Sequence, residues 1–174
     1  MASKIKQKTM GMLLLAVPLL LLALSFTKFE IRHDIEINAS PETVWKAILN
    51  FPNYKAWNTQ LVFLGGDVQA NGNLHLKLSA AGTEPYEFKP IISSWEENKK
   101  FAWLAQTGGI PRIFDGEHFF ELKDLGNGKT LLTNREEYRG ILSLIFKNLP
   151  MMKDAPEGFK KMNVELKNHI ENQN

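Results

Sequence analysis

The feature that most constrains the fold of this chain is a β-hairpin predicted over residues 112–139. Two runs with strand character flank Asn127-Gly128, and Asn-Gly between such runs strongly indicates a hairpin turn. Side chains alternate along a strand, so Phe120 and Leu122 share one face of the first run. A slip of one residue would put them on the opposite side from Leu132, so the hydrophobic pattern resists that slip. The pattern therefore predicts which residues face the core.

The core-facing side of this hairpin also carries polar residues. Folding the chain at the turn places His118 opposite Glu136 and Phe120 opposite Asn134, and Tyr138 lies on the same face. Polar groups on a core-facing strand are costly unless they are paired, so these side chains either pair with one another or line a cavity. A buried imidazole beside a carboxylate can act as a general acid or base near neutral pH. His118 and Glu136 are therefore the candidate catalytic residues, and a purely structural pair is the alternative.

Composition excludes several kinds of site. The chain has 174 residues, about one domain, and no cysteine, which excludes disulfides, cysteine-bound zinc and thiol nucleophiles. A net charge of +2 gives no reason to expect nucleic-acid binding. The four histidines are scattered, and the sequence contains no phosphate loop or dinucleotide fingerprint. We therefore expect neither a metal site nor a cofactor.

The N-terminal segment is apolar and follows a basic tail over residues 1–8. Met10 to Phe26 carries no charge, and its length of roughly 25 Å as a helix is marginal for a bilayer core of about 30 Å. We interpret residues 9–27 as a transmembrane anchor; the alternatives are a signal peptide cleaved after Ala23-Leu24-Ser25 and a buried core helix. The basic tail favours a cytoplasmic N-terminus. This predicts a single-pass membrane protein with the domain at residues 28–174 on the extracytoplasmic side.

The domain begins with a predicted strand and two short helices. Phe29 to Asn38 alternates apolar and charged residues, which is typical of a strand with one solvated face. His33 alternates with isoleucines there and is expected to be a core histidine with its hydrogen bonds satisfied. Ser40 is a helix N-cap, and Pro41 fits the first helical position. Residues 51–57 predict a break and then a short second helix.

The rest of the chain predicts antiparallel strands and a long final helix. We expect three or four strands between Leu61 and Gln106, one of them running from Tyr86 to Trp95 with an edge or bulge at Pro90. Ile141 to Met152 is apolar almost all round and is a buried helical turn, a flexible lid or a second membrane contact. Asp154 to Asn172 predicts the C-terminal helix. Its apolar stripe consists of Phe159, Met162, Leu166 and Ile170.

This order of elements resembles the START-like helix-grip fold of the SRPBCC superfamily. Residues 39–45 and 51–58 resemble the opening of members often labelled polyketide cyclase/dehydrase, and Phe114–His118 and Gly158–Lys167 resemble two later signatures of one bacterial subgroup. The resemblance covers residues 29–172. It implies an α+β fold in which a curved antiparallel sheet wraps around a long C-terminal helix and leaves a cavity, here preceded by the predicted transmembrane helix. It does not fix the chemistry.

Three functions are compatible with this sequence. The first is a membrane-anchored domain that binds a hydrophobic small molecule or lipid in an internal cavity. The second is a polyketide cyclase/dehydratase-like lyase that uses His118 and Glu136 as acid and base. The third is an interaction protein that acts through its surface. Nothing in the sequence names a substrate, so we rank binding above catalysis. The candidate ligand contacts are Trp57, Trp103, Phe120, Asn134, Tyr138 and Asn163.

Overall fold

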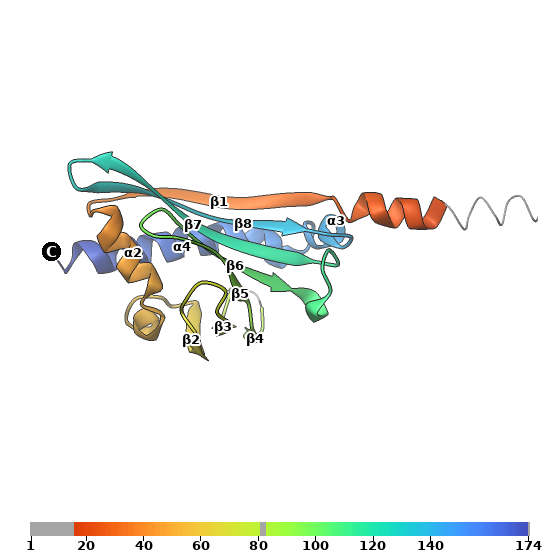
Figure 1. The fold of residues 1–174 in the computed structure, drawn as a ribbon, viewed down its shortest axis with the longest axis horizontal. Coiled ribbons are helices and arrows are strands. Elements are labelled where there is room, and N and C mark those ends of the chain that lie inside the picture. The colour runs from red at the N-terminus through yellow and green to blue at the C-terminus, as the bar shows by residue number, and fades with distance from the viewer. Residues whose placement is uncertain (1–15, 81–82, 174) are drawn as a thin grey trace, which may run out of the picture.

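The structure is a computed structural model that describes residues 16–80 and 83–173. Figure 1 shows an α+β unit built from strands and one long helix. The strands are β1 (Lys28–Ile37), β2 (Leu61–Gly66), β3 (Leu74–Leu78), β4 (Tyr86–Phe88), β5 (Ile91–Glu96), β6 (Lys100–Gln106), β7 (Asp115–Gly126) and β8 (Lys129–Arg139). The helices are α2 (Pro41–Leu49), the 3₁₀ turns η1 (Phe51–Ala56) and η2 (Thr107–Gly109), α3 (Ser143–Phe146) and α4 (Pro150–Glu171).

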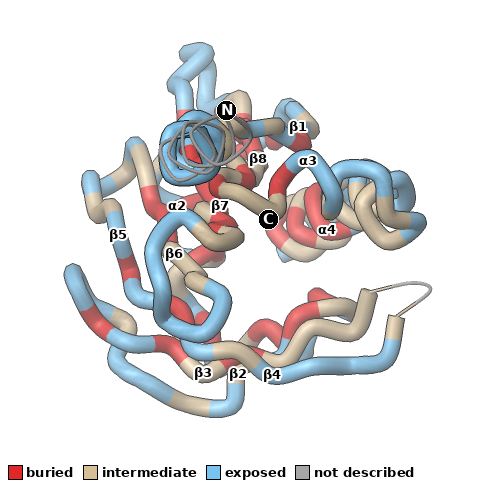
Figure 2. Tube along the Cα trace, turned by 90° about the vertical axis from the view of Figure 1, so that its right-hand side faces the viewer, coloured by how far each residue is buried: buried red, intermediate tan, exposed pale blue. Residues whose placement is uncertain are grey.

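The strands form two antiparallel sheets. The larger sheet has the order β1-β8-β7-β6-β5, and the smaller one has the order β2-β3-β4. The larger sheet is curved around α4, which is the predicted helix-grip arrangement (Figures 1 and 2). The three residues Met162, Leu166 and Ile170 of α4 are buried in the core between helix and sheet, as the apolar stripe predicted.

The β7–β8 hairpin has the predicted register. His118 pairs with Glu136, and Leu122 pairs with Leu132. Asn127 and Gly128 at the turn have φ values of 52° and 71°. This left-handed region is accessible to asparagine and glycine at little cost, which is why this pair can close the hairpin.

The core beside α4 is rich in aromatic side chains. Beside this core, Ser40 caps α2 by accepting a hydrogen bond from the Thr43 N–H, as predicted. The helix α2 and the turn η1 then close one end of the space between the larger sheet and α4.

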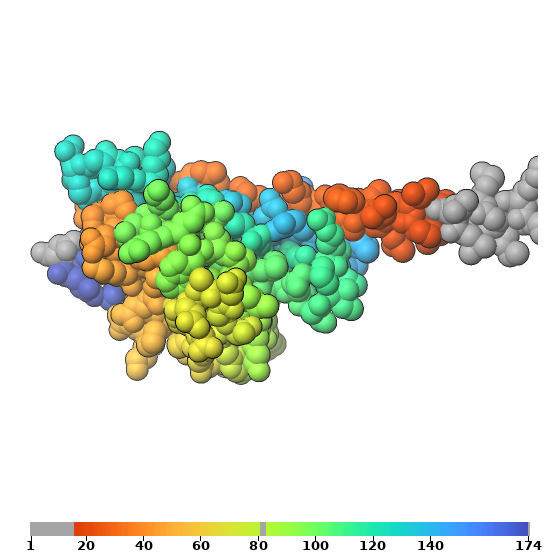
Figure 3. Space-filling view, in the orientation of Figure 1, coloured from red at the N-terminus to blue at the C-terminus, as the bar shows by residue number. Residues whose placement is uncertain are grey.

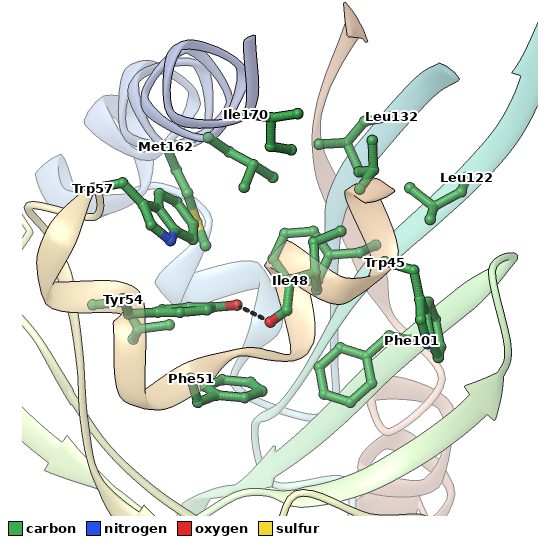
Figure 4. Close-up of a cluster of buried hydrophobic side chains, with 14 of the residues drawn as sticks. Trp45, Ile48, Phe51, Tyr54, Trp57, Phe101, Leu122, Leu132, Met162 and Ile170 are labelled. Atoms are coloured by element: carbon green, nitrogen blue, oxygen red, sulfur yellow. Dashed lines mark hydrogen bonds between the residues drawn. The ribbon is translucent and has the colours of Figure 1, made fainter. Parts of the chain in front are cut away.

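A buried tyrosine lies among these aromatic residues. Figure 4 shows the Tyr54 hydroxyl donating to the Ile48 carbonyl oxygen at 2.7 Å. This bond satisfies the one polar atom of a fully buried ring, so the tyrosine packs at no hydrogen-bonding cost. The surrounding core residues include Trp45, Phe51, Trp57, Phe101 and Trp103.

The predicted strand from Tyr86 to Trp95 is two strands in the structure. β4 pairs with β3 in the smaller sheet, whereas β5 pairs with β6 in the larger one. The break falls at Pro90, which has no N–H to give to a ladder. Its carbonyl oxygen accepts from the Leu74 N–H at 2.9 Å, and this bond joins the two sheets where the chain passes between them. The prediction of three or four strands over this region was therefore wrong, and the structure has five.

The segment before the C-terminal helix also differs from its prediction. α4 begins at Pro150 rather than at Asp154, with proline in the first turn and Pro156 inside the helix. A proline in the first turn leaves no helical hydrogen bond unmade. The apolar segment preceding it forms α3, where Leu144 and Ile145 are exposed. It is therefore not a buried helical turn.

The chain enters the domain from a helical stretch over residues 16–24. This stretch points away from the two sheets, roughly in line with β1 (Figures 1 and 3). Most of its side chains are exposed, including Leu19, Leu20 and Leu22. Within the described range, the structure has no helix that is both long enough and apolar enough to span a bilayer. The anchor predicted over residues 9–27 lies partly outside that range.

Candidate functional site

A cavity lies between the first half of α4 and the two sheets. It has two adjoining compartments, an outer one of about 600 Å³ and an inner one of about 380 Å³. α4 and the smaller sheet border the outer compartment, and Figure 2 shows these elements on opposite sides of the space. The inner compartment reaches β6, β7 and β8. The two share an apolar lining that includes Leu61, Leu78, Met151, Met152 and Phe159.

His118 lies at the inner compartment between two aromatic rings. Its imidazole stacks on Trp103, with ring centroids 4.4 Å apart, and on Phe159, with centroids 5.2 Å apart. Its Nδ1 lies 3.5 Å from Oε2 of Glu136, the residue opposite on β8. Its Nε2 is buried and has no hydrogen-bond partner among the described residues. A buried polar atom of this kind is costly unless something satisfies it, so Nε2 can hydrogen-bond a ligand.

Glu136 lies over a glycine of the neighbouring strand. A Cβ atom placed on Gly116 would come within 2.6 Å of the Glu136 Oε1 atom. The absence of a side chain at position 116 is therefore what leaves room for the carboxylate beside the cavity. In the β7–β8 ladder Gly116 pairs with Tyr138, two residues after Glu136, so the hairpin register places Gly116 diagonally across from Glu136.

Tyr138 adds a hydrogen-bond donor to the same wall. Burial raises the pKa of the Tyr138 phenol well above its ordinary value, and the nearby charge of Glu136 raises that pKa further. Desolvation and a neighbouring negative charge both disfavour a phenolate. The hydroxyl therefore stays protonated at neutral pH and can donate either to Glu136 or to a ligand.

The structure brings four of the predicted site residues to the cavity. His118, Glu136, Trp103 and Tyr138 all line the inner compartment. The hairpin parity explains the placement of three of them, because they lie on the same face of β7 and β8. Trp103 joins them because it pairs with His118 across β6 and β7.

The other predicted ligand contacts lie in the protein core instead. Phe120 is buried beside Phe101 and Trp103, and Trp57 packs on Tyr54. These aromatic rings fill the interior and do not line either compartment.

Asn134 and Asn163 are also fully buried and bind each other across the helix–sheet contact. The Asn134 side-chain amide donates to Asn163 Oδ1 at 2.8 Å. The Asn163 amide nitrogen lies 2.9 Å from the carbonyl oxygen of His33 and 2.9 Å from the Nδ1 atom of that histidine. This network fastens α4 to β8 and β1. The network also engages the Nδ1 atom of His33, which is half-buried rather than the core histidine that the sequence predicted.

Several cavity residues were not predicted from the sequence. Tyr86 reaches the cavity because β4 pairs with β3, and that pairing is not visible in the local sequence pattern. Met151 and Met152 lie at the start of α4, in the apolar segment for which a lid was one interpretation. Phe159 was assigned to the core stripe, yet it faces His118. Over residues 16–80 and 83–173, no cluster of His, Asp or Glu side chains is placed to hold a metal ion.

A family profile and several solved structures are similar to this chain. The profile of the family described as polyketide cyclase / dehydrase and lipid transport matches residues 28–171. No curated protein shows significant sequence similarity to the chain.

Three solved structures illustrate the likeness in fold. A START superfamily protein from Mycobacterium smegmatis is 21% identical with a TM-score of 0.63, covering 83% of this chain and 99% of that one. A point mutant of norcoclaurine synthase from Thalictrum flavum is 13% identical with a TM-score of 0.63, covering 86% and 98%. A protein from Thermus thermophilus is 15% identical with a TM-score of 0.63, covering 82% and 97%. At these identities the likeness shows the fold alone.

Proposed function

The chain belongs to the polyketide cyclase / dehydrase and lipid transport family, and from this premise we propose that it binds a hydrophobic small molecule or lipid beneath α4. The observation that carries the proposal is the cavity, whose lining is mainly apolar, with His118, Glu136 and Tyr138 at the inner compartment and Asp154, Glu157 and Lys161 of α4 at the outer one. Ligand sites are commonly about 300–1,000 Å³ with this kind of lining. The outer compartment, at about 600 Å³, falls within that range.

The polar groups suggest the chemistry of the ligand. His118 Nε2 can donate or accept, depending on its tautomer, and Tyr138 can donate. The apolar side chains that α4 contributes include Met151, Met152 and Phe159, and flexible methionines adapt to varied apolar shapes. The proposed ligand therefore has an apolar body and one hydroxyl or carbonyl group that reaches the inner compartment.

We also propose that the N-terminal segment anchors the domain to a membrane. Residues 16–24 expose leucines on several sides, and contiguous apolar surface of this kind is rare on soluble monomers. The basic tail favours a cytoplasmic N-terminus. On this proposal the domain lies on the extracytoplasmic side of the membrane, close to its surface.

The ligand proposal is tested by mass spectrometry of what co-purifies with the full chain. We expect an apolar compound to be enriched over an unrelated membrane protein purified in the same detergent. Ala155→Trp should fill the outer compartment, which Ala155 lines, and should remove the compound. Val164→Trp adds the same bulk at an exposed position of α4 and should retain it. If neither the wild type nor Val164→Trp is enriched in any compound, the binding proposal is wrong.

A second candidate function is the cyclase/dehydratase-like reaction, which the His118–Glu136 pair favours. An imidazole nitrogen free to face a ligand, with a carboxylate near the other nitrogen, is an arrangement suited to proton transfer. Once the ligand is identified, His118→Phe separates the two functions, because phenylalanine keeps the stacking between Trp103 and Phe159. In an enzyme, turnover should fall far more than ligand occupancy, because the variant loses the proton-transfer group but keeps the apolar contacts that hold most of the ligand. A binding protein has no turnover to lose.

A further inference from the structure

We propose that an exposed apolar rim beside the cavity rests on the surface of a lipid bilayer. The rim consists of Phe26, Ile110, Leu144 and Ile145. This inference rests on the proposed anchor and goes beyond it, because it assigns a second membrane contact to the folded domain and fixes which side of the domain faces the lipid.

The rim is formed by large apolar side chains that are exposed to water. The exposed fractions are 64% for Phe26, 56% for Ile110, 49% for Leu144 and 62% for Ile145. Single exposed apolar residues are common on soluble proteins, whereas a group of them marks a contact site. These four come from three segments that are far apart in sequence, so local sequence does not explain their grouping.

Hydrogen bonds hold the base of the N-terminal helix against α3. The Thr27 hydroxyl lies 2.9 Å from the Gly140 carbonyl oxygen and 2.6 Å from the Ser143 hydroxyl, and Ser143 is fully buried. The Gly140 N–H donates to the Thr27 carbonyl oxygen at 3.1 Å. The first residues of α3 are thereby fixed beside the point where the chain enters β1.

The loop between η2 and β7 is held in the same place. The Arg112 carbonyl oxygen accepts from the Ile141 N–H at 2.9 Å, and the Arg112 guanidinium lies 4.9 Å from the centre of the Phe26 ring. The Phe114 ring stacks on Phe146 of α3, with centroids 4.2 Å apart. The three segments that carry the rim are therefore packed together at the end of the domain from which the N-terminal helix projects (Figures 1 and 3).

A bilayer is the occupant that fits this position. Only Ser25, Phe26 and Thr27 separate the end of the helix at residue 24 from β1, and three residues span at most roughly 10 Å. When the apolar helix enters a membrane, the rim must therefore lie close to that membrane. Arg112 and Lys147 lie in the same segments, are exposed, and form no ion pair within the described residues. Cations at such positions attract anionic lipid headgroups.

The cavity lies immediately behind the rim. Phe146 of α3 and Thr107 of η2 line the inner compartment, and Met151 lines both compartments. The side chains that neighbour them in sequence, Leu144, Ile145 and Ile110, point outward instead. The same two segments thus border the proposed lipid site on one side and the proposed membrane contact on the other.

Depth-dependent quenching of a fluorescent label tests the proposal. The chain has no cysteine, so single-cysteine variants of the full chain can be labelled at one position each. The test positions are Ile110→Cys, Leu144→Cys and Ile145→Cys, reconstituted in phosphatidylcholine vesicles that contain a lipid with a quencher on its acyl chain. Leu20→Cys, in the apolar helix, is the positive control. Leu125→Cys, which is 40% exposed near the hairpin turn, is the matched negative control.

We expect the three rim labels to lose fluorescence, though less than the deeper Leu20 label, and the Leu125 label to keep it. Rim labels that behave like the Leu125 label, while the Leu20 label is quenched, would overturn the rim proposal and leave the anchor intact. A Leu20 label that is not quenched would overturn the anchor and the rim together. Rim labels shielded from both lipid quencher and aqueous iodide would show that a protein covers the rim, which also overturns the proposal. Ligand co-purification is measured separately, so the binding proposal can fail on its own.

Discussion

At the scale of single residues, His118 and Glu136 are the pair on which both candidate functions depend. The sequence predicted their opposition from the position of the hairpin turn, and the structure has that register. The parity of Leu122 and Leu132 argues against a slip of one residue, but a slip of two would have kept the same face and given His118 a different partner. The sequence could not predict that Gly116 makes room for the Glu136 carboxylate, because that contact depends on the side chain reaching across to the next strand. The alternation of side chains along a strand determines which face of the sheet a residue lies on, whereas the direction in which a long side chain points on that face depends on the neighbouring residues.

The His118–Glu136 pair should show energetic coupling if it is structural. Glu136→Leu leaves a buried histidine without its carboxylate, and His118→Phe leaves the carboxylate without its histidine. Each single change removes one partner of a partly buried pair, which is costlier than removing both. We expect the double variant to be more stable than the sum of the single losses predicts, by about 0.5–3 kcal/mol. Urea unfolding of the four proteins gives the coupling, and additive losses would show that the two side chains do not interact.

At the scale of elements, α4 is fastened at its C-terminal half and borders the cavity with its N-terminal half. The Lys167 ammonium donates to the Glu36 carbonyl oxygen at 2.7 Å, and Asn163 binds His33. By contrast, Met151 and Phe159 face the cavity. The apolar stripe of α4 was predictable because helical spacing is a local property. The division of α4 into a fastened half and a half that lines the cavity was not predictable, because it depends on which strands face each half of the helix.

The fastened half of α4 should be sensitive to truncation. Leu166 is fully buried against the sheet. We expect Leu166→Ala to lower the free energy of unfolding by about 2–5 kcal/mol, because it removes buried methyl groups and leaves a cavity. Val164→Ala, two residues earlier on an exposed part of the helix, should change it by no more than about 0.5 kcal/mol. Thermal or urea unfolding measures both, and similar losses for the two would mean that the buried face is misassigned.

The outer face of the larger sheet should contribute stability that depends on pH. The Arg135 guanidinium donates to Glu121 at 2.8 Å, and this hydrogen bond lowers the pKa of the Glu121 carboxyl. A lowered pKa means that this contribution is present above the unfolded value of about 4.3 and is lost as the pH falls through the folded value. Glu121→Gln should therefore be less stable than the wild type at neutral pH and equal to it in acid.

Unfolding by urea between neutral and acidic pH measures this difference. The change Glu97→Gln in the β5–β6 turn removes an exposed carboxylate and is the matched control. A gap between wild type and Glu121→Gln that stays constant down to about pH 3, well below the unfolded pKa, would contradict the assignment.

At the scale of the whole molecule, the fold was predictable to the extent that local patterns determine it. The hairpin, the capped helix after Ser40 and the long final helix follow from turn, cap and periodicity signals. The division into two sheets at Pro90 was missed, because whether a proline bends a strand or ends it depends on the partner strands. The sequence left the apolar segment over residues 141–152 open between a buried turn, a lid and a membrane contact, because an apolar segment is buried only where other elements cover it. The exposure of Leu144 and Ile145 excludes the buried turn.

The proposed N-terminal anchor leads to a prediction about the whole molecule. We expect the intact mass of protein extracted from membranes to include residues 9–27, because the uncharged segment from Met10 to Phe26 is at the lower end of the length range of transmembrane helices. A change of Leu20 and Leu22 to lysine should release the domain from the membrane, since charged side chains are costly in the bilayer core. A mature protein that begins at Phe26 would instead identify a cleaved signal peptide and end the anchor proposal.

The full-length pairing of β1 has a mechanical consequence. β1 pairs with β8 from Lys28 opposite Arg139 to Ile37 opposite Thr130, and the helical stretch over residues 16–24 leads almost directly into Lys28. The hydrogen bonds of an antiparallel ladder lie across the strands, so a pull along β1 strains all of them at once rather than opening them one by one. The C-terminus lies at the other end of the domain (Figure 1). Tension between the two ends therefore acts on this ladder in shear, the direction in which paired strands resist force best.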